Sequence, residues 1–259
     1  MAAPLGERPL TARNVIASTL LGVRPPELAG RVLVRSGELF GIAEGTTRVA
    51  LSRMVAAGEL EADGGRYRLT GRLLARQARQ AESRTGATGP WDGTWRLAVV
   101  TADRRPAADR ADLRAAMAGL RLAERREGVW LRPDNLDPAR LPGARAVADR
   151  QCAWFRAEPD DDPAALAAAL WDLDGWAGGA TALLGRMAAR VGDLERGGTA
   201  ALAPGFVLSA AVLRHLQADP LLPADLLPAG WPGDELRRAY DRYDAAFAAA
   251  WRDWFRGQP

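Results

Sequence analysis

The sequence contains no lysine, so all 35 of its basic residues are arginine. This absence excludes a phosphate-binding P-loop lysine, a lysine Schiff base and a lysine general base from the chemistry of the chain. Cysteine and histidine occur once each, as Cys152 and His215. One cysteine cannot form a disulfide within a single chain, and a metal site made by this chain would depend on carboxylates. We therefore expect no metal and no cofactor.

Long apolar runs are also missing. No stretch approaches the ~20 uninterrupted apolar residues that a membrane helix needs. The first 14 residues lack the apolar core of a secretory signal. With 48% hydrophobic and 26% charged residues, the chain has an ordinary globular composition. We expect a cytoplasmic protein without membrane association, built from one large domain or two to three small ones.

The charge is unevenly distributed along the chain. Residues 1–90 carry 13 arginines and 8 acidic residues, a net charge of +5, whereas the remainder carries 22 arginines and 24 acidic residues, a net charge of −2. A GC-rich genome would favour arginine over lysine everywhere, which does not account for this asymmetry. A basic segment beside a near-neutral remainder is typical of a polyanion-binding module joined to a second function.

The first 84 residues have the pattern of three helices followed by a hairpin. The helices are predicted over residues 11–21 (capped by Thr11), roughly 31–40, and 46–57. Two strands, over 59–62 and 66–69, flank Asp63, Gly64 and Gly65, which is a hairpin signal. A further helix is predicted over 70–79, and the polar, glycine-rich segment 82–90 is predicted to be a flexible linker.

The third of these helices shows the pattern of a recognition helix. Small and apolar residues recur at i, i+3, i+4 and i+7, so that one face packs inward. The opposite face presents arginine, serine, threonine and one small apolar side chain, which suit guanine, phosphate and a thymine methyl group in a major groove. The following hairpin would be the wing of a winged helix-turn-helix. The predicted DNA-binding residues are Thr46, Arg48, Val49, Ser52 and Arg53 on the helix and Arg66 and Arg68 on the wing. The alternative is an amphipathic helix with a solvated arginine face.

The rest of the chain divides into two further segments. Residues 91–160 contain predicted strands over 95–100, 128–131 and 152–156 and a helix over 107–122, which fits a small α+β unit. Residues 163–259 are mostly helical, with helices predicted over 164–173, 181–191, 206–217 and 234–255 and a proline-rich interruption over 219–233. We therefore predict an α+β protein with a winged helix-turn-helix domain (1–84), a middle domain (91–160) and a helical carboxy-terminal domain (163–259).

Several segments together resemble one family. Residues 37–77, GELFGIAEGTTRVALSRMVAAGELEADGGRYRLTGRLLARQ, resemble the amino-terminal domain of PaaX-type regulators, the repressors of phenylacetate-degradation genes. WDGTWRL (91–97) and REGVWLRP (126–133) resemble the family's middle domain, and DPLLPADLLP (219–228) with WPG (231–233) resembles its carboxy-terminal domain. The resemblance implies a ferredoxin-like, Cas2-like middle domain. It also implies a dimeric bacterial transcriptional repressor of an aromatic-acid catabolic operon, released from DNA by an aryl-acyl-CoA such as phenylacetyl-CoA.

The expected partners follow from this resemblance. They are double-stranded DNA with an inverted-repeat operator, a second copy of the chain, and the acyl-CoA effector. Such an effector has phosphates at one end and an apolar acyl group at the other, so its pocket needs both arginine and aromatic side chains. The candidate effector-binding residues are Trp130, Arg132, Trp154, Arg156 and Arg214. The linker over 82–90 is the expected hinge between sensing and DNA binding.

The alternative class is an enzyme, a CoA-thioester hydrolase or nuclease that uses the winged helix for docking. The sequence lacks a G-x-S-x-G motif, a cysteine and histidine close together, and a carboxylate cluster with metal-ligand spacing. Cys152 lies in an apolar strand and is expected to be a core thiol. His215 is expected to have a packing or surface role, and Asp103 and the run Asp160, Asp161 and Asp162 are expected to lie in solvated loops. We therefore predict no catalytic residues and no enzyme.

Overall fold

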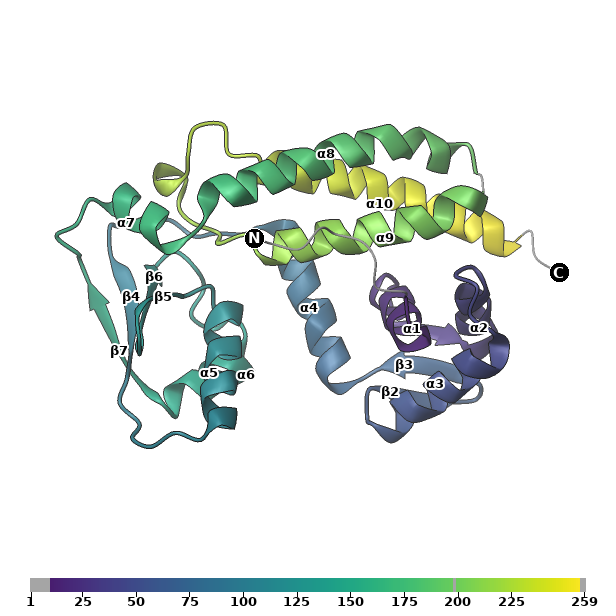
Figure 1. Cartoon of the computed structure of the whole chain (residues 1–259), viewed down its shortest axis with the longest axis horizontal. Helices are drawn as coiled ribbons and strands as arrows, with labels where there is room; N and C mark the ends of the chain where they lie inside the picture. Colours follow the sequence, from purple (N-terminus) through teal and green to yellow (C-terminus); the bar gives the residue numbers. More distant parts are fainter. Residues whose placement is uncertain (1–9, 198, 257–259) are drawn as a thin grey trace. The chain divides into compact units, whose positions relative to one another are not determined.

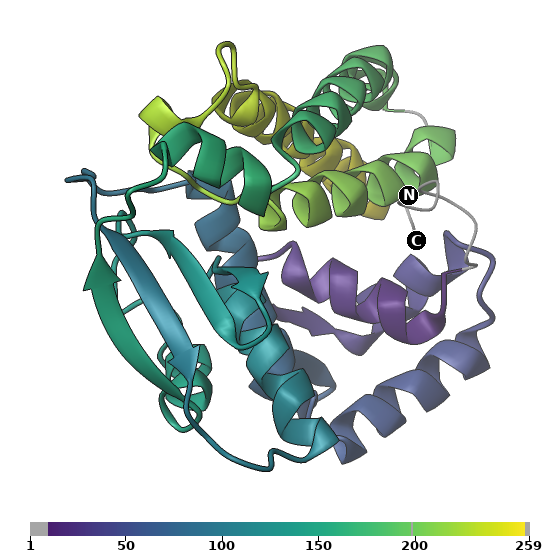
Figure 2. The ribbon, with the colours of Figure 1, turned by 60° about the vertical axis from the view of Figure 1, so that its left-hand side comes forward.

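The computed structural model describes residues 10–197 and 199–256, and these residues form two compact units. The described residues of the first unit are 10–85, 180–197, 199–217 and 233–256. The second comprises Gly86–Gly179 and Ala218–Pro232. Figure 1 labels their helices and strands, and Figure 2 gives a second view. Both helices and antiparallel sheets are present, so the predicted α+β class is confirmed.

The first unit begins with a winged helix-turn-helix. Its elements in order are α1 (Ala12–Leu21), β1 (Glu27–Ala29), α2 (Gly30–Glu38), α3 (Glu44–Ala56), β2 (Leu60–Asp63) and β3 (Arg66–Leu69). The side chain of Thr11 caps α1 by accepting a hydrogen bond from the Asn14 backbone N–H at 3.2 Å, as its sequence position predicts. The three strands form an antiparallel sheet in the order β1-β3-β2. Strand β1 was not predicted, and it adds a third strand to the expected hairpin. The core contains Ile16, Leu20, Leu33, Leu51, Met54 and Leu69.

Helix α4 (Gly71–Thr85) is longer than predicted and corrects the position of the linker. Residues 82–85 are helical, and the Ser83 side chain is fully buried. Arg84 forms ion pairs with Asp241 at 2.7 Å and Asp244 at 2.8 Å. It also lies over the ring of Tyr240, 5.0 Å from its centroid. The beginning of the predicted hinge is therefore packed, because these tertiary partners are far away in the sequence.

The helices α8 (Leu173–Glu195), α9 (Thr199–Gln217) and α10 (Gly233–Arg256) run side by side (Figure 1). Each is longer than predicted. Helix α9 packs on α10 and on α4, with the Tyr243 hydroxyl donating to the Gly205 carbonyl at 3.2 Å. A Cβ at Gly205 would lie 3.0 Å from Phe247, so the lack of a side chain at this position allows α9 to approach α10 closely. Within the described residues, α9 alone has the length and apolar composition to cross a membrane, and 39% of it is buried inside the protein.

The second unit contains a ferredoxin-like βαββαβ domain. Its elements are β4 (Trp95–Val100), α5 (Ala107–Gly119), β5 (Ala123–Arg126), β6 (Val129–Pro133), α6 (Pro142–Asp149) and β7 (Cys152–Ala157). The antiparallel sheet has the strand order β5-β6-β4-β7, which is the order of a ferredoxin-like domain. Strand β4 has the predicted bounds, whereas β5 and α6 were not predicted from the residues themselves.

The two faces of this sheet are covered differently. Ala98, Trp130 and Cys152 face α5 and α6 and form one core with Leu113, Met117 and Ala148. Trp95 and Leu131 face the opposite side, where α7 (Pro163–Leu170) and the 3-10 helix η1 (Ala224–Leu226) form a second core with Leu222. The proline-rich segment around residues 219–228 therefore packs on the sheet of the middle domain.

Candidate nucleic-acid interface

Helix α3 presents one face to the core, as its sequence pattern predicts. Thr47 is fully buried, and Leu51 and Met54 are each 2% exposed. Gly37 of α2 lies so close that a Cβ at this position would be 2.4 Å from Oγ1 of Thr47. Helices α2 and α3 can therefore approach closely only because residue 37 has no side chain. This contact sets the position of α3 relative to α2.

The opposite face of α3 is exposed and carries the predicted recognition residues. Thr46, Arg48, Ser52 and Arg53 are all exposed, and the Val49 side chain, at 51% exposure, is one of the few large apolar groups open to solvent. Nε of Arg48 donates to the Glu44 carboxylate at 2.7 Å, one turn earlier in the helix. The Ser52 hydroxyl donates to the Arg48 carbonyl at 3.2 Å. The helix therefore presents cationic, hydroxyl and small apolar groups together.

The wing is a tight hairpin between β2 and β3. Gly64 and Gly65 both have positive φ angles, 52° and 77°, which a two-residue turn of this kind requires. Arg66 forms an ion pair with Glu27 of β1, and Arg68 forms one with Glu61 of β2 at 2.7 Å. The hydrogen bond from Arg66 is the main reason that the pKa of Glu27 lies below its usual value. The wing arginines are thus held in the sheet by carboxylates.

Acidic neighbours are a shared feature of this surface. Arg48, Arg66 and Arg68 each have a carboxylate partner, and the three arginine side chains are between 55% and 66% exposed. Exposed ion pairs of this kind contribute only ~0–1 kcal/mol, so a phosphate or base edge can displace the carboxylate. These acidic residues orient the guanidinium groups, and an anion that displaces them loses little binding free energy by doing so.

A hollow of about 670 Å³ lies between α1 and α3. Its lining includes Thr46, Val49 and Arg53 from α3 and Arg13 from α1, together with Glu59. Arg13 donates to Glu59 at 2.9 Å, and Glu59 is only 6% exposed. The predicted recognition face therefore continues into a concave surface whose arginines come from two helices. Arg13 carries no local sequence signal for this site, because its partner Glu59 is 46 residues away.

The structure brings four of the five candidate effector residues onto one face of the middle-domain sheet. Arg132 and Arg156 both lie opposite Arg96 of β4, and Trp130 and Trp154 both lie opposite Ala98 in the next row. Because opposed residues of an antiparallel pair point to the same side, these rows share one face. Arg214 instead lies on α9 in the first unit.

These four residues differ in burial. Trp130 is 8% exposed and belongs to the core beneath α5 and α6, and Arg132 is 4% exposed. Arg132 donates to the Pro220 carbonyl at 3.3 Å and the Leu221 carbonyl at 3.0 Å, and so ties the proline-rich segment to β6. Trp154 is half-buried and Arg156 is exposed. Arg132 and Trp130 thus stabilise the fold of the unit.

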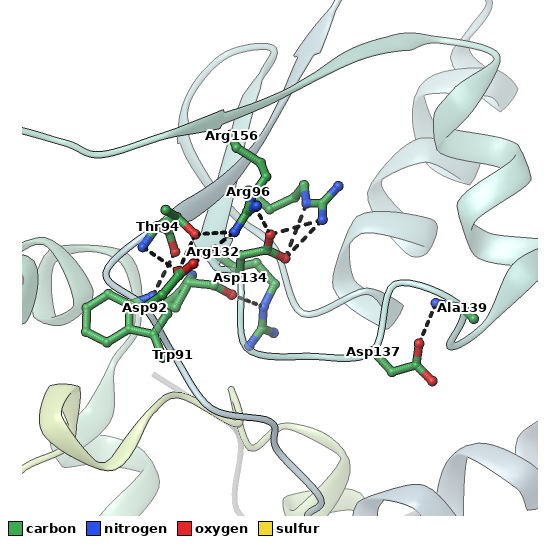
Figure 3. A network of polar contacts seen from close by, with 10 residues as sticks. Trp91, Asp92, Thr94, Arg96, Arg132, Asp134, Asp137, Ala139 and Arg156 are labelled. Atoms are coloured by element: carbon green, nitrogen blue, oxygen red, sulfur yellow. Dashed lines mark hydrogen bonds and ion pairs between the residues drawn. The ribbon is translucent and has the colours of Figure 1, made fainter.

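A small hollow of about 40 Å³ lies beside these rows. Its lining includes Arg132 and Trp154 together with Arg96, Arg140 and Arg145, which the sequence analysis did not single out. Figure 3 shows Asp134 between Arg96 and Arg156; it accepts from Arg96 and from Arg156 at 3.0 Å each. The guanidinium of Arg145 stacks 4.0 Å from the centroid of the Trp154 ring. The strand register was the missing signal, because it alone aligns Arg96 with Arg132 and Arg156.

The residues considered for catalysis are dispersed. The Cys152 thiol is buried, and this burial is the main cause of its raised pKa. Asp103, Asp160, Asp161 and Asp162 are exposed, and His215 is half-buried in the last turn of α9. Within residues 10–197 and 199–256, no three histidine, cysteine or acidic side chains lie close enough together to hold a metal ion.

Comparisons with known proteins agree with this architecture. Three family models match successive parts of the chain: PaaX-like protein over residues 11–73, the PaaX protein central Cas2-like domain over 88–164, and the PaaX-like protein C-terminal domain over 171–257. A solved structure of the uncharacterised protein Rv0674 from Mycobacterium tuberculosis is similar, with 44% identity and a TM-score of 0.72. That similarity covers 94% of this chain and 98% of the other. The comparison with curated proteins gives no match. Because the three PaaX models together span most of its length, the chain belongs to the PaaX family, whose members are regulators.

Proposed function

We propose that this protein is a transcriptional repressor that binds operator DNA through α3 and the β2–β3 wing. The observation that supports this most directly is the exposed face of α3. Arg48, Val49 and Arg53 project from a helix whose other face is fixed in the core. Arginine reads guanine in the major groove, and a small apolar group suits the thymine methyl. In this proposal the wing arginines contact the DNA backbone.

The active species in this proposal is a homodimer on an inverted repeat. One winged helix buries roughly 600–1,000 Å² on DNA, whereas specific complexes usually bury 1,000–2,500 Å². Two copies related by a two-fold axis double the contact and match half-sites one or more helical turns apart. Sedimentation of the full chain at micromolar concentration tests this assembly. A full chain that sediments as a monomer and still binds its operator specifically would contradict the dimer.

The proposed effector is an aryl-acyl-CoA, and the proposed target is an operon for degradation of a phenylacetate-type aromatic acid. Trp154 supports a ring-and-anion binding site because it lines a hollow together with Arg140 and Arg145, whereas the buried Arg132 would only shape its wall. The hollow has room for only a few water molecules as it stands. Binding therefore requires Arg145 to leave the Trp154 ring. A coupling of about 1–3 kcal/mol, or 5–150-fold in operator affinity, is enough for induction.

The experiment is a titration of the DNA complex with a panel of ligands. The probe is a duplex from upstream of this gene and its neighbouring operon, labelled for fluorescence anisotropy. Phenylacetyl-CoA is expected to release the protein, whereas free phenylacetate and free CoA are not. Trp154→Ala should weaken the response to phenylacetyl-CoA without weakening DNA binding. If no acyl-CoA shifts the binding curve, the effector assignment is wrong, and the DNA-binding assignment is judged separately by the discrimination between this duplex and a scrambled one.

No observation favours the alternative of an enzyme that uses the winged helix for docking. A hydrolase of this kind needs a nucleophile within hydrogen-bond reach of a base. The buried Cys152 thiol has a raised pKa, whereas a nucleophilic thiol needs a lowered one. A thioesterase and nuclease assay alongside the DNA titration would detect such an activity.

A further inference from the structure

Three arginines follow one face of α4. Arg72, Arg76 and Arg79 are spaced at i, i+4 and i+7, so they lie above one another along the helix. Seven residues of α-helix rise about 10 Å, which equals the rise of about three phosphates of one strand measured along the DNA axis. Helix α4 leads from the wing to the helices of the same unit (Figure 1).

The amino-terminal end of this row, at Arg72, adjoins the hollow beside α3. Glu59 accepts from Arg13 of α1 and lies 3.6 Å from Arg72 of α4, so two arginines converge on one buried carboxylate. Arg13 and Glu59 also line the hollow that contains Arg53 of α3. The cationic surface is therefore continuous from the predicted recognition helix, through α1, to the base of α4.

The carboxy-terminal part of the row, Arg76 and Arg79, lies toward α9. Helix α9 packs on α4, and Arg214 is exposed in its last turn. The pKa of the Arg76 guanidinium is lowered, first by its desolvation and then by the charges of Arg214, Arg79 and Arg13. In the part of the chain that the structure describes, no carboxylate forms an ion pair with Arg76, Arg79 or Arg214. Guanidinium groups this close together disfavour one another's charged form. An external anion would relieve this repulsion.

We propose that these five residues, Arg13, Arg72, Arg76, Arg79 and Arg214, form an arginine ridge that binds the phosphates of DNA flanking a half-site. This inference rests on the proposed DNA-binding function and extends the interface beyond the winged helix to α9. An extended polyanion suits the ridge better than a small ligand, because the Arg72 side chain is 88% exposed and Arg214 is also exposed. In this proposal the DNA that extends from the recognition helix runs along the ridge, because the ridge continues the α3 surface.

The ridge also connects DNA binding to the helices of the first unit. Arg214 belongs to α9, whereas the recognition residues belong to α3. A duplex that contacts both fixes the winged helix relative to α9. Phosphate contacts of this kind add affinity and orientation without reading sequence. The ridge is therefore expected to strengthen binding to operator and unrelated DNA alike.

The test compares two double variants of the full chain in fluorescence anisotropy. Arg76→Gln with Arg214→Gln removes two ridge charges, and Arg238→Gln with Arg252→Gln removes two exposed charges from α10 as the matched control. The probes are a duplex selected by the protein from random-sequence DNA, with flanks of 15 base pairs and with flanks removed. Affinity is measured between 50 and 200 mM salt.

On flanked DNA, the ridge variant should reduce the salt slope by about 2 relative to the wild type. The ratio of wild-type to variant affinity should then fall about tenfold between 50 and 200 mM salt. On DNA without flanks, the wild type and the ridge variant should bind alike. If the ridge variant keeps the salt slope and flank dependence of the control, the ridge does not contact DNA.

The outcome is separable from that of the proposed function. Arg53→Ala tests the recognition helix through the discrimination between selected and scrambled duplexes. If Arg53→Ala loses that discrimination while the ridge variant keeps the wild-type salt slope, the result supports α3 as the recognition helix and overturns the ridge. If the wild type binds selected and scrambled duplexes equally, the repressor proposal fails. The difference in salt slope between the wild type and the ridge variant on scrambled DNA still decides whether the ridge binds phosphate.

Discussion

The ion pair between Arg48 and Glu44 permits a sharp test of the recognition helix. Nη2 of Arg48 lies 2.6 Å from the Glu44 carboxylate, and the two side chains are 66% and 53% exposed. An exposed i, i+4 pair on a helix contributes about 0.3–0.5 kcal/mol to stability. Neither Arg48→Ala nor Glu44→Gln should therefore unfold the protein, and both variants can be compared directly on DNA.

The two substitutions are expected to act in opposite directions on DNA affinity. A bidentate contact between arginine and guanine contributes about 1–3 kcal/mol of discrimination, so Arg48→Ala should weaken operator binding by about 5–150-fold. Glu44→Gln removes the carboxylate that competes for Arg48 and a negative charge near the DNA. Affinity should rise about twofold, which corresponds to the ~0.3–0.5 kcal/mol that the wild type loses when the pair separates.

Anisotropy titrations of both single variants and the double variant, on operator and scrambled duplexes, would measure these effects. The double variant should discriminate between the duplexes as poorly as Arg48→Ala, because Glu44 acts on sequence reading through Arg48. Unchanged affinity and discrimination for Arg48→Ala would refute the assignment of α3. A loss in Glu44→Gln as large as that in Arg48→Ala would show that Glu44 positions the arginine rather than competing for it.

Three further predictions concern stability. Arg84→Met removes two ion pairs and the stack on Tyr240, and because Arg84 is partly exposed the free energy of unfolding should fall by only about 1–2 kcal/mol in urea titration. The control Arg242→Met changes an exposed arginine of α10 and should alter that free energy by less than ~0.5 kcal/mol. Gly37→Ala should cost about 1–3 kcal/mol, because its Cβ would collide with the buried Thr47, whereas Gly45→Ala meets no atom within 4 Å and should be neutral or stabilising; equal melting temperatures for the two would refute the packing argument. The hydrogen bond from Arg13 lowers the pKa of Glu59 below its ordinary 4.5, so its contribution is present above that value and is lost as the pH falls through the folded-state pKa. Arg13→Met should therefore flatten the loss of stability as the pH falls below 4.5, and an unchanged pH profile would contradict this.

The elements with strong local signals were predictable from the sequence. Thr11 caps the amino-terminal end of α1, the i, i+3, i+4, i+7 spacing defines the buried face of α3, and the apolar run of β4 has the predicted bounds. These features depend on side chains within a few residues of one another. The resemblance to the PaaX family supplied the ferredoxin-like domain, which the residues alone indicated only as a small α+β unit.

Elements that depend on distant partners were not predictable. Strand β1 has three residues and follows two prolines, so only its pairing with β3 makes it a strand. The end of α4 looked like a linker because it is polar and leads into glycine-rich sequence. In the fold, Arg84 meets two aspartates about 160 residues away. Local composition cannot distinguish a solvated arginine from one with a tertiary partner.

By itself, the sequence determined the fold class, the α3 pattern and the absence of lysine, because each depends on composition or on periodicity along one element. The tertiary structure alone decided what each arginine does. Arg132 was a candidate ligand contact and is a buried tie to the proline-rich segment, whereas Arg13 and Arg76 had no distinguishing local pattern and lie in one cationic surface. A guanidinium group has the same chemistry in every sequence context, and its role depends on whether a carbonyl, a carboxylate or another guanidinium is brought beside it when the chain folds.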